Sequence, residues 1–264
     1  MRHCAYCGQP APQTGEHIFS SCLIKRQPES QLRMHRMPTK FIPPHQTIND
    51  VCEECNSQRL GETDAEICRL YDEYFSTLVE SEENVKFEYD FNLLSRWLMK
   101  SSYNSIRAGR KKYEETRLRN LSEYIIGKGK PEFYFSIFVL LVTPYELKER
   151  DIEELSNVDE LNFDYLEGEK GRLEPEIMGA KQFGLEEGNL GRTEIYLCLI
   201  NSYFFFALIH SKNRFQAKAA DKEFGQLAPN LNRLSNYPNG CLLSASEYDF
   251  IRAADTFGLI HTDG

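Results

Sequence analysis

The sequence predicts an α+β protein, in which a cysteine-rich N-terminal module precedes a larger domain of mixed helices and strands. The prediction depends on two Cys-x-x-Cys pairs, on apolar residues recurring at three and four positions, and on unbroken apolar runs beyond residue 131. Such a change of period is typical of helices followed by buried strands. We divide the chain into a module over residues 1–80, a basic helical segment over 81–130 and an α+β domain over 131–264.

The two Cys-x-x-Cys pairs form the clearest motif of the chain. Cys4 with Cys7, and Cys52 with Cys55, have the ligand set and pair spacing of a four-thiolate zinc site. Such a site has no open coordination position, so its Zn²⁺ would hold a small domain together. The remaining cysteines have no paired spacing and are expected to be ordinary small core residues: Cys22, Cys68, Cys198 and Cys241.

Capping signals and helical periodicity predict three helices. Thr63 and Glu66 have the spacing of a capping box at the start of a helix, and Ser244 and Glu247 have the same spacing near the end of the chain. A third helix is expected over residues 92–107. Its inward-facing side chains are expected to be Leu94, Trp97, Leu98 and Ile106.

Three apolar runs predict buried strands in the C-terminal half. They span residues 133–142, 194–200 and 203–210, and they are rich in aromatic and β-branched residues. Asn201-Ser202 separates the last two runs by two residues, which is compatible with a tight hairpin turn. A single continuous bent strand is the alternative.

Charge is unevenly distributed along the chain. The net charge is −9, but residues 1–60 carry +2 and residues 91–130 carry +7. Because local fields attract phosphates, both zones are candidate nucleic-acid contacts, with solvated surface charge as the alternative.

The longest apolar stretch, residues 195–209, is too short to span a bilayer and the start lacks an apolar signal segment. We therefore expect a cytoplasmic protein without a membrane partner.

Glu16-His17-Ile18-Phe19 lies between the cysteine pairs, and Asn56 directly follows the last cysteine. In this order the motifs resemble the HNH (His-Me finger, ββα-metal) endonucleases, most closely the phage recombination endonuclease VII type with a four-cysteine zinc site. The resemblance covers about residues 4–64 and implies a zinc-stapled treble-clef module. It also implies that His17 is the general base and that Glu16 and Asn56 ligate a catalytic Mg²⁺ or Mn²⁺. The alternative role for Asn56 is to cap or buttress the helix that starts near the second cysteine pair.

These residue types suit the hydrolysis of phosphodiesters. A neutral imidazole near pH 7 can accept the proton that the attacking water loses, which is the role expected of His17. Hard oxygen ligands such as those of Glu16 and Asn56 can hold a divalent ion beside the leaving oxygen. Adjacent strand residues point to opposite faces, so a bend or bulge is needed for Glu16 and His17 to share a site. Asn49, Thr47 or a backbone carbonyl would orient the imidazole.

The expected substrate is DNA in preference to RNA, and by analogy the biological context is phage, mobile-element or anti-phage defence. Phosphate contacts are expected from the basic segment between the cysteine pairs: Lys25, Arg26, Arg33 and Arg36. The second basic zone, Arg107 to Arg119, could extend this track or face a protein partner. The alternative function is a non-catalytic zinc-binding module that presents the C-terminal domain to a protein or nucleic-acid partner, and such a module has no need for Glu16, His17 and Asn56 together.

Overall fold

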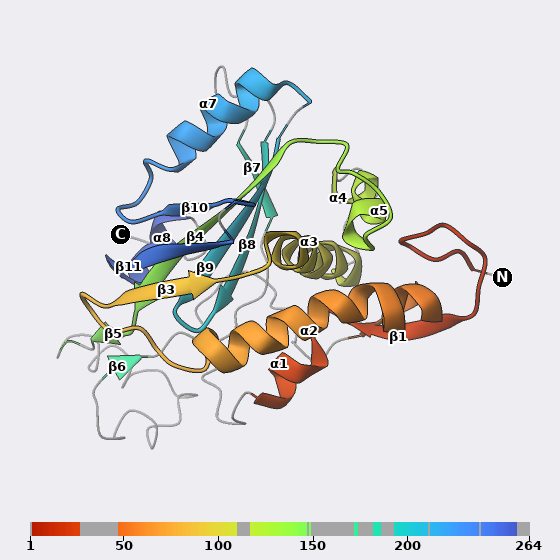
Figure 1. The fold of residues 1–264 in the computed structure, drawn as a ribbon, viewed down its shortest axis with the longest axis horizontal. Coiled ribbons are helices and arrows are strands. Elements are labelled where there is room, and N and C mark those ends of the chain that lie inside the picture. Colours follow the sequence, from red (N-terminus) through yellow and green to blue (C-terminus); the bar gives the residue numbers. More distant parts are fainter. Residues whose placement is uncertain are drawn as a thin grey trace.

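The computed structural model describes residues 2–26, 47–109, 117–146, 148, 172–173, 182–185, 193–210, 212–237 and 239–257. Figure 1 shows a small N-terminal part at one end of the molecule and a large twisted sheet at the other. The expected mixture of helices and strands is confirmed. Among the helices in the described ranges, none combines the length and the apolar character needed to cross a membrane.

The N-terminal part consists of a strand pair and a long helical rod. Strands β1 (Gln13–His17) and β2 (Thr47–Cys52) pair antiparallel, and the short helix α1 (Ser21–Arg26) follows β1. The rod is continuous through three consecutive segments after β2. These segments are η1 (Glu54–Leu60, π-helical), α2 (Gly61–Leu70) and η2 (Tyr71–Phe75, π-helical).

The helix start predicted at Thr63 is wrong, because the rod begins about ten residues earlier. Gly61 adopts helical dihedral angles (φ −56°, ψ −34°) and so continues the rod instead of ending it. The Thr63 hydroxyl is buried and donates to the carbonyl of Leu60 at 2.8 Å. Glu66 accepts hydrogen bonds from the backbone of Asp90 and from Arg69, so both expected cap residues serve other contacts.

The helix predicted over residues 92–107 is confirmed as α3 (Phe91–Ala108). Asp90 is its N-cap, and its carboxylate accepts from the backbone N–H of Leu93 at 2.9 Å. The four residues expected to face inward are all buried. Two short helices follow, α4 (Arg117–Asn120) and α5 (Ser122–Ile125), and both pack against α3.

Seven strands form the main sheet, in the order β3-β11-β4-β9-β8-β7 with β10 paired to β4. All neighbours are antiparallel except β11 and β4, which are parallel. The bounds are β3 Asn84–Glu88, β4 Phe135–Thr143, β7 Gln182–Leu185, β8 Thr193–Ile200, β9 Tyr203–Ile209, β10 Asn232–Leu234 and β11 Gly240–Asp249. A separate two-stranded sheet pairs β5 (Tyr145–Glu146) with β6 (Arg172–Leu173).

The three predicted apolar strands are β4, β8 and β9, and the hairpin alternative is the correct one. Ile200 pairs with Tyr203 across a two-residue turn, and Asn201 has a positive φ of 48°. Asparagine tolerates this left-handed conformation better than most residues. Ser244 and Glu247 do not start a helix, since both lie in β11, where pairing with β3 and β4 overrides the cap spacing. Helix α8 (Phe250–Thr256) begins only after that strand.

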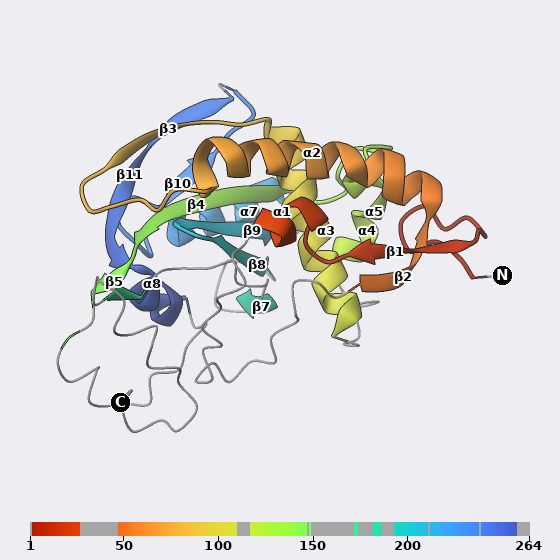
Figure 2. The same ribbon diagram turned by 90° about the horizontal axis from the view of Figure 1, so that it is seen from below.

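The sheet is buried on both faces. Alternate residues of β4 point to opposite sides, with Ile137, Val139 and Leu141 in one apolar cluster and Phe138 and Leu140 in the other. Helices α2 and α3 cover the first face, and α7 (Arg214–Phe224) and α8 cover the second (Figures 1 and 2). The first cluster also includes core residues of the N-terminal part, so the apolar interior is continuous from the cysteine-rich end to the sheet.

Candidate metal centre and the surroundings of Glu16, His17 and Asn56

The four cysteines of the two pairs lie together in one cluster. The Sγ atoms of Cys4, Cys7, Cys52 and Cys55 all lie within 4.8 Å of one another, and those of Cys7 and Cys52 are 3.8 Å apart. Four sulfurs at about 2.3 Å around a tetrahedral Zn²⁺ would be separated by roughly 3.8 Å. The cluster can therefore hold a metal ion such as zinc.

The surroundings of Cys4 favour a thiolate. The backbone N–H of Cys52 donates to Cys4 Sγ at 3.4 Å. Burial raises the pKa of the Cys4 thiol, but backbone N–H groups of Cys52, Cys7 and Tyr6 lower it, and the result is a pKa of about 7. In contrast, burial raises the pKa of the Cys55 thiol well above its ordinary range. A metal ion would supply the positive charge that the buried thiolates lack.

Glu16 lies in a buried cluster of three charged side chains. Lys100 from α3 is fully buried, and its Nζ is 2.6 Å from Glu16 Oε1 and 2.7 Å from Asp64 Oδ1. Burial raises the pKa of the Glu16 carboxyl, and the Lys100 ammonium opposes this rise. The pKa of Lys100 is raised despite its burial, because the two carboxylates favour the ammonium. One cation between two acids leaves the cluster with a net charge of −1 when all three are ionised.

The strand that carries Glu16 and His17 has a bulge beside it. The register shifts by one residue between Thr14 and Glu16, so Asn49 and Asp50 of β2 lie opposite Gly15 alone. A Cβ on Gly15 would lie 3.2 Å from Asn49 Oδ1, so a larger residue here would require the Asn49 side chain to move slightly. The predicted irregularity is therefore present, but it precedes the Glu16-His17 step and lies on the partner strand. The two side chains consequently differ in exposure, Glu16 being 3% exposed and His17 partly exposed.

His17 is held through its backbone. Its carbonyl accepts a hydrogen bond of 3.1 Å from Asn104 Nδ2 of α3. Asn104 Oδ1 in turn accepts from the Tyr6 hydroxyl at 2.6 Å and from Arg107. Within the described residues the imidazole itself makes no hydrogen bond, so neither Asn49 nor Thr47 orients the ring in this way.

Asn56 links the helical rod to β1. Its side-chain amide donates to Thr14 Oγ1 at 2.8 Å and to the carbonyl of Gly15 at 3.1 Å. The amide oxygen is left without a hydrogen-bond donor from the described part of the chain. Glu16 Oε1 likewise accepts no well-aligned hydrogen bond, although Lys100 lies close to it. The described contacts therefore leave the amide oxygen of Asn56 free, whereas the carboxylate of Glu16 is engaged by the Lys100 ammonium.

Four side chains of α3 connect the helix to the N-terminal part, and sequence reasoning missed this role. Trp97 donates to Ser20 Oγ at 2.7 Å, Lys100 contacts Glu16 and Asp64, Asn104 contacts His17, and Arg107 donates to Asp50 at 2.5 Å. Their spacing of three and four places them on one helix face. The sequence gives no clear signal for this role, since a lysine in a helix is usually solvated.

The prediction for two of the remaining cysteines is wrong. Cys22 of α1 and Cys68 of α2 form a disulfide, with their Cα atoms 6.1 Å apart. The two residues meet because α1 packs against α2, and their separation of 46 residues gave no hint of this. Cys198 and Cys241 are free thiols, as expected.

The predicted basic contacts differ in their surroundings. Arg26 forms a two-bond pair with Asp72, with distances of 2.6 and 2.7 Å. Lys25 is exposed at the end of α1, and Arg33 and Arg36 lie outside the described residues. Arg107 is buried between the rings of Tyr6 and Tyr103. It is therefore not a surface contact for a nucleic acid or a partner, and the prediction for this residue of the second basic zone is wrong.

We predict that the purified protein contains about one tightly bound zinc per chain. In Cys4→Ser or Cys55→Ser the zinc is lost and the N-terminal part unfolds, because metal binding supplies folding free energy in such sites. Cys241→Ser removes a free thiol outside the cluster and is the matched control. Elemental analysis and thermal unfolding measure both effects. Equal zinc content in Cys4→Ser and Cys241→Ser would exclude the cluster as the metal site.

Removal of the buried ammonium should strongly destabilise the fold. Lys100→Met keeps the length of the side chain but leaves Glu16 without its counter-charge, so we expect a decrease of about 3–5 kcal/mol in the free energy of unfolding. Adding Glu16→Gln should restore part of that stability. In the control Lys86→Met, the exposed pair of Lys86 with Glu88 is removed and stability should hardly change. Chemical denaturation measures the free energy of unfolding. Equal values for Lys100→Met and Lys86→Met would contradict a structural role of the cluster formed by Glu16, Asp64 and Lys100.

No protein-family model matches the chain, and no curated protein or solved structure is significantly similar to it. The family resemblance thus depends on the order of the motif residues: the cysteine pairs, Glu16-His17 and Asn56. The structure adds the positions of these residues relative to one another. The four cysteines form one cluster, and Asn56 contacts the strand that carries Glu16 and His17.

Proposed function

We propose that the chain is a metal-dependent endonuclease of the HNH type, which hydrolyses DNA phosphodiester bonds. The observation that carries the proposal is the contact of Asn56 with β1, directly beside Glu16 and His17 in a module that also holds the four-cysteine cluster. This juxtaposition is what a ββα-metal module requires: a strand pair, a helix after the last cysteine, and one ligand from each. The treble-clef arrangement and the structural Zn²⁺ belong to the same proposal.

In this proposal the residues divide the chemistry among them. His17 accepts the proton of the attacking water, since its imidazole is partly exposed and makes no hydrogen bond within the described structure. Glu16 and Asn56 would hold Mg²⁺ or Mn²⁺ through their side-chain oxygens. When bound, the ion stabilises the negative charge that develops on the leaving oxygen.

Lys100 has a positioning role in the proposed site. It opposes the rise that burial causes in the pKa of the Glu16 carboxyl and lies 2.6 Å from one of its oxygens, and Asp64 shares the same ammonium. A carboxylate has two oxygens, so an ion pair at Oε1 leaves the second oxygen for a cation. The net charge of −1 on the three-residue cluster also favours a cation over an anion at this point.

The burial of Glu16 favours a second candidate function. A carboxylate that is 3% exposed and paired with a buried lysine is also what a purely structural charge cluster would contain. In that case the four-cysteine part is a non-catalytic zinc module that binds a nucleic-acid or protein partner together with the sheet domain. The two candidates differ in one measurable property, metal-dependent cleavage.

The general-base role is tested with His17→Ala. Nicking of supercoiled plasmid DNA in Mg²⁺ or Mn²⁺ should slow by about 10²- to 10⁴-fold, because the water loses its proton acceptor. Zinc content, thermal unfolding and DNA affinity should stay close to wild type. His3→Ala removes an exposed imidazole from the same module and should nick normally. Unreduced nicking by His17→Ala would eliminate His17 as the base, and absence of nicking by wild type would favour the non-catalytic module.

The basic segment is tested through the salt dependence of DNA binding. A side chain that contacts a phosphate contributes about 0.9 to the slope of log K against log salt, so its neutralisation should flatten the slope by that amount. We expect glutamine substitutions to weaken binding to unrelated duplexes alike, with Arg26 contributing least because Asp72 already pairs with it. The residues changed are Lys25, Arg26, Arg33 and Arg36. A control neutralises four cations elsewhere: Lys86, Lys128, Lys212 and Arg252. Identical slopes for the two quadruple variants would show that this segment is not the DNA track.

A further inference from the structure

A second polar site lies on the opposite face of the sheet from the N-terminal part. A pocket of about 680 Å³ opens between α7, β4 and β10. Its wall from β4 includes Ser136 and Phe138, which point to the same face as the cluster beneath α7 and α8. None of the residues proposed for cleavage lines this pocket, so it is independent of the proposed endonuclease function.

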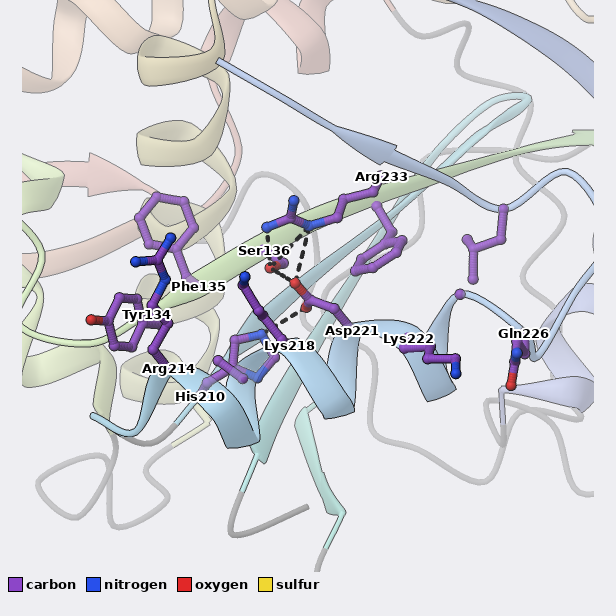
Figure 3. Close-up of a pocket in the computed structure, with 14 residues that line it drawn as sticks. Tyr134, Phe135, Ser136, His210, Arg214, Lys218, Asp221, Lys222, Gln226 and Arg233 are labelled. Atoms are coloured by element: carbon purple, nitrogen blue, oxygen red, sulfur yellow. Dashed lines mark hydrogen bonds and ion pairs between the residues drawn. The ribbon is translucent and has the colours of Figure 1, made fainter. Parts of the chain in front are cut away.

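A hydrogen-bond network centred on Asp221 of α7 lines the pocket, with His210 and Ser136 buried and Arg233 exposed. His210, which is 1% exposed, places Nε2 at 2.9 Å from Asp221 Oδ1. Ser136 Oγ donates to Asp221 Oδ2 at 2.7 Å, and Arg233 Nε lies 3.0 Å from the same oxygen. Figure 3 shows these side chains converging on Asp221 from several elements. The single carboxylate of the pocket is thus fully engaged by neighbouring donors.

Three further cations line the pocket without an acidic partner. Arg214, Lys218 and Lys222 stand on α7 at positions separated by four residues, and no carboxylate of the described residues pairs with them. Figure 3 shows the side chains of Arg214, Lys218 and Arg233 reaching toward the side of the pocket where Ser136 lies. With Arg233 and Asp221 balancing each other, these three cations give the pocket a positive charge in a chain of net charge −9. Such a concentration of positive charge favours an anionic ligand.

The volume of the pocket and the ring of Tyr134 restrict the class of anion that it could bind. Arginine and lysine together with hydroxyl donors are the groups that bind phosphates. The volume is in the range of pockets for small organic ligands and is larger than an isolated phosphate needs. The ring of Tyr134, 46% exposed, lies at the rim and offers a face on which a base can stack.

We propose that this pocket binds a small phosphorylated ligand, with a nucleoside diphosphate or triphosphate as the best fit. Arg214 and Lys218 contact the phosphates, Lys222 adds positive charge farther along α7, Arg233 is held at the edge by Asp221 and Ser136, and Tyr134 stacks on the base. The same phosphate chemistry occurs in a single-stranded nucleic acid that crosses the pocket, and the experiment distinguishes the two sources.

The test measures binding by titration calorimetry on the full chain, with pyrophosphate, ADP and a single-stranded DNA of twelve nucleotides as separate probes. Arg214→Gln with Lys218→Gln should weaken pyrophosphate and ADP at least about tenfold. Arg252→Gln with Lys86→Gln carries the same charge change outside the pocket and should bind like wild type. Tyr134→Ala should weaken ADP but not pyrophosphate. Circular dichroism checks that each variant is folded.

Two results would overturn the proposal. The first is that wild type binds neither pyrophosphate nor ADP at millimolar concentration, or that the two double variants bind them equally well. The second is that only the oligonucleotide binds and that Arg214→Gln with Lys218→Gln abolishes this binding, which would make the pocket a nucleic-acid contact instead.

Discussion

The N-terminal part of the molecule depends on α3, because it cannot bury enough apolar surface by itself. Four side chains of this helix reach into it at successive turns: Trp97, Lys100, Asn104 and Arg107. Each of them donates to a group of the N-terminal part, and the Glu16 carboxylate among these is buried, where an unpaired charge would be costly. The opposite side of α3 packs on the sheet, so one helix sets the position of the cysteine-rich end relative to the main core.

This arrangement makes the candidate site a product of two distant segments. Glu16, His17 and Asn56 come from the first sixty residues, but the groups that hold the first two are on α3. A four-cysteine site fixes the ends of the strand pair and of the helical rod, whereas α3 fixes the strand between them. Cysteine ligation alone would leave β1 free to shift, and a shift of one residue would exchange the faces of Glu16 and His17. The two constraints are therefore complementary.

Much of the fold could be predicted from local patterns, and what could not depends on tertiary contacts. The cysteine pairs, the helix around Trp97 and the hairpin at Asn201-Ser202 follow from spacing and period alone. The helix start predicted at Thr63 is wrong because Gly61 adopts helical dihedral angles and the rod runs through it. The helix start predicted at Ser244 is wrong because the pairing of β11 with two strands outweighs the capping preference of this residue. Lys100 could not be assigned, since a lysine in a helix is usually solvated and only the fold reveals its two carboxylate partners.

For the candidate site, the order of residues along the chain carried more information than their individual types. Glu16-His17 and Asn56 would be unremarkable without the cysteines, and the cysteines bring their segments together. The same reasoning fails for the pocket beside α7, because its residues come from β4, α7, β10 and the end of β9 and form no motif in the sequence. Sites assembled by the packing of a sheet are hidden from pattern reading for this reason.

The two sites lie on opposite faces of the sheet, and this limits how they can influence each other. A coupling would have to pass through the sheet itself. The strand β4 is the element common to both faces, since Ser136 contacts the Asp221 network and Val139 belongs to the core shared with the N-terminal part. Because β4 is held by β9, β10 and β11, a ligand beside α7 can act on the far face only by shifting a strand that is fixed along its length. A rigid sheet of this kind favours two sites that bind independently over two that are coupled.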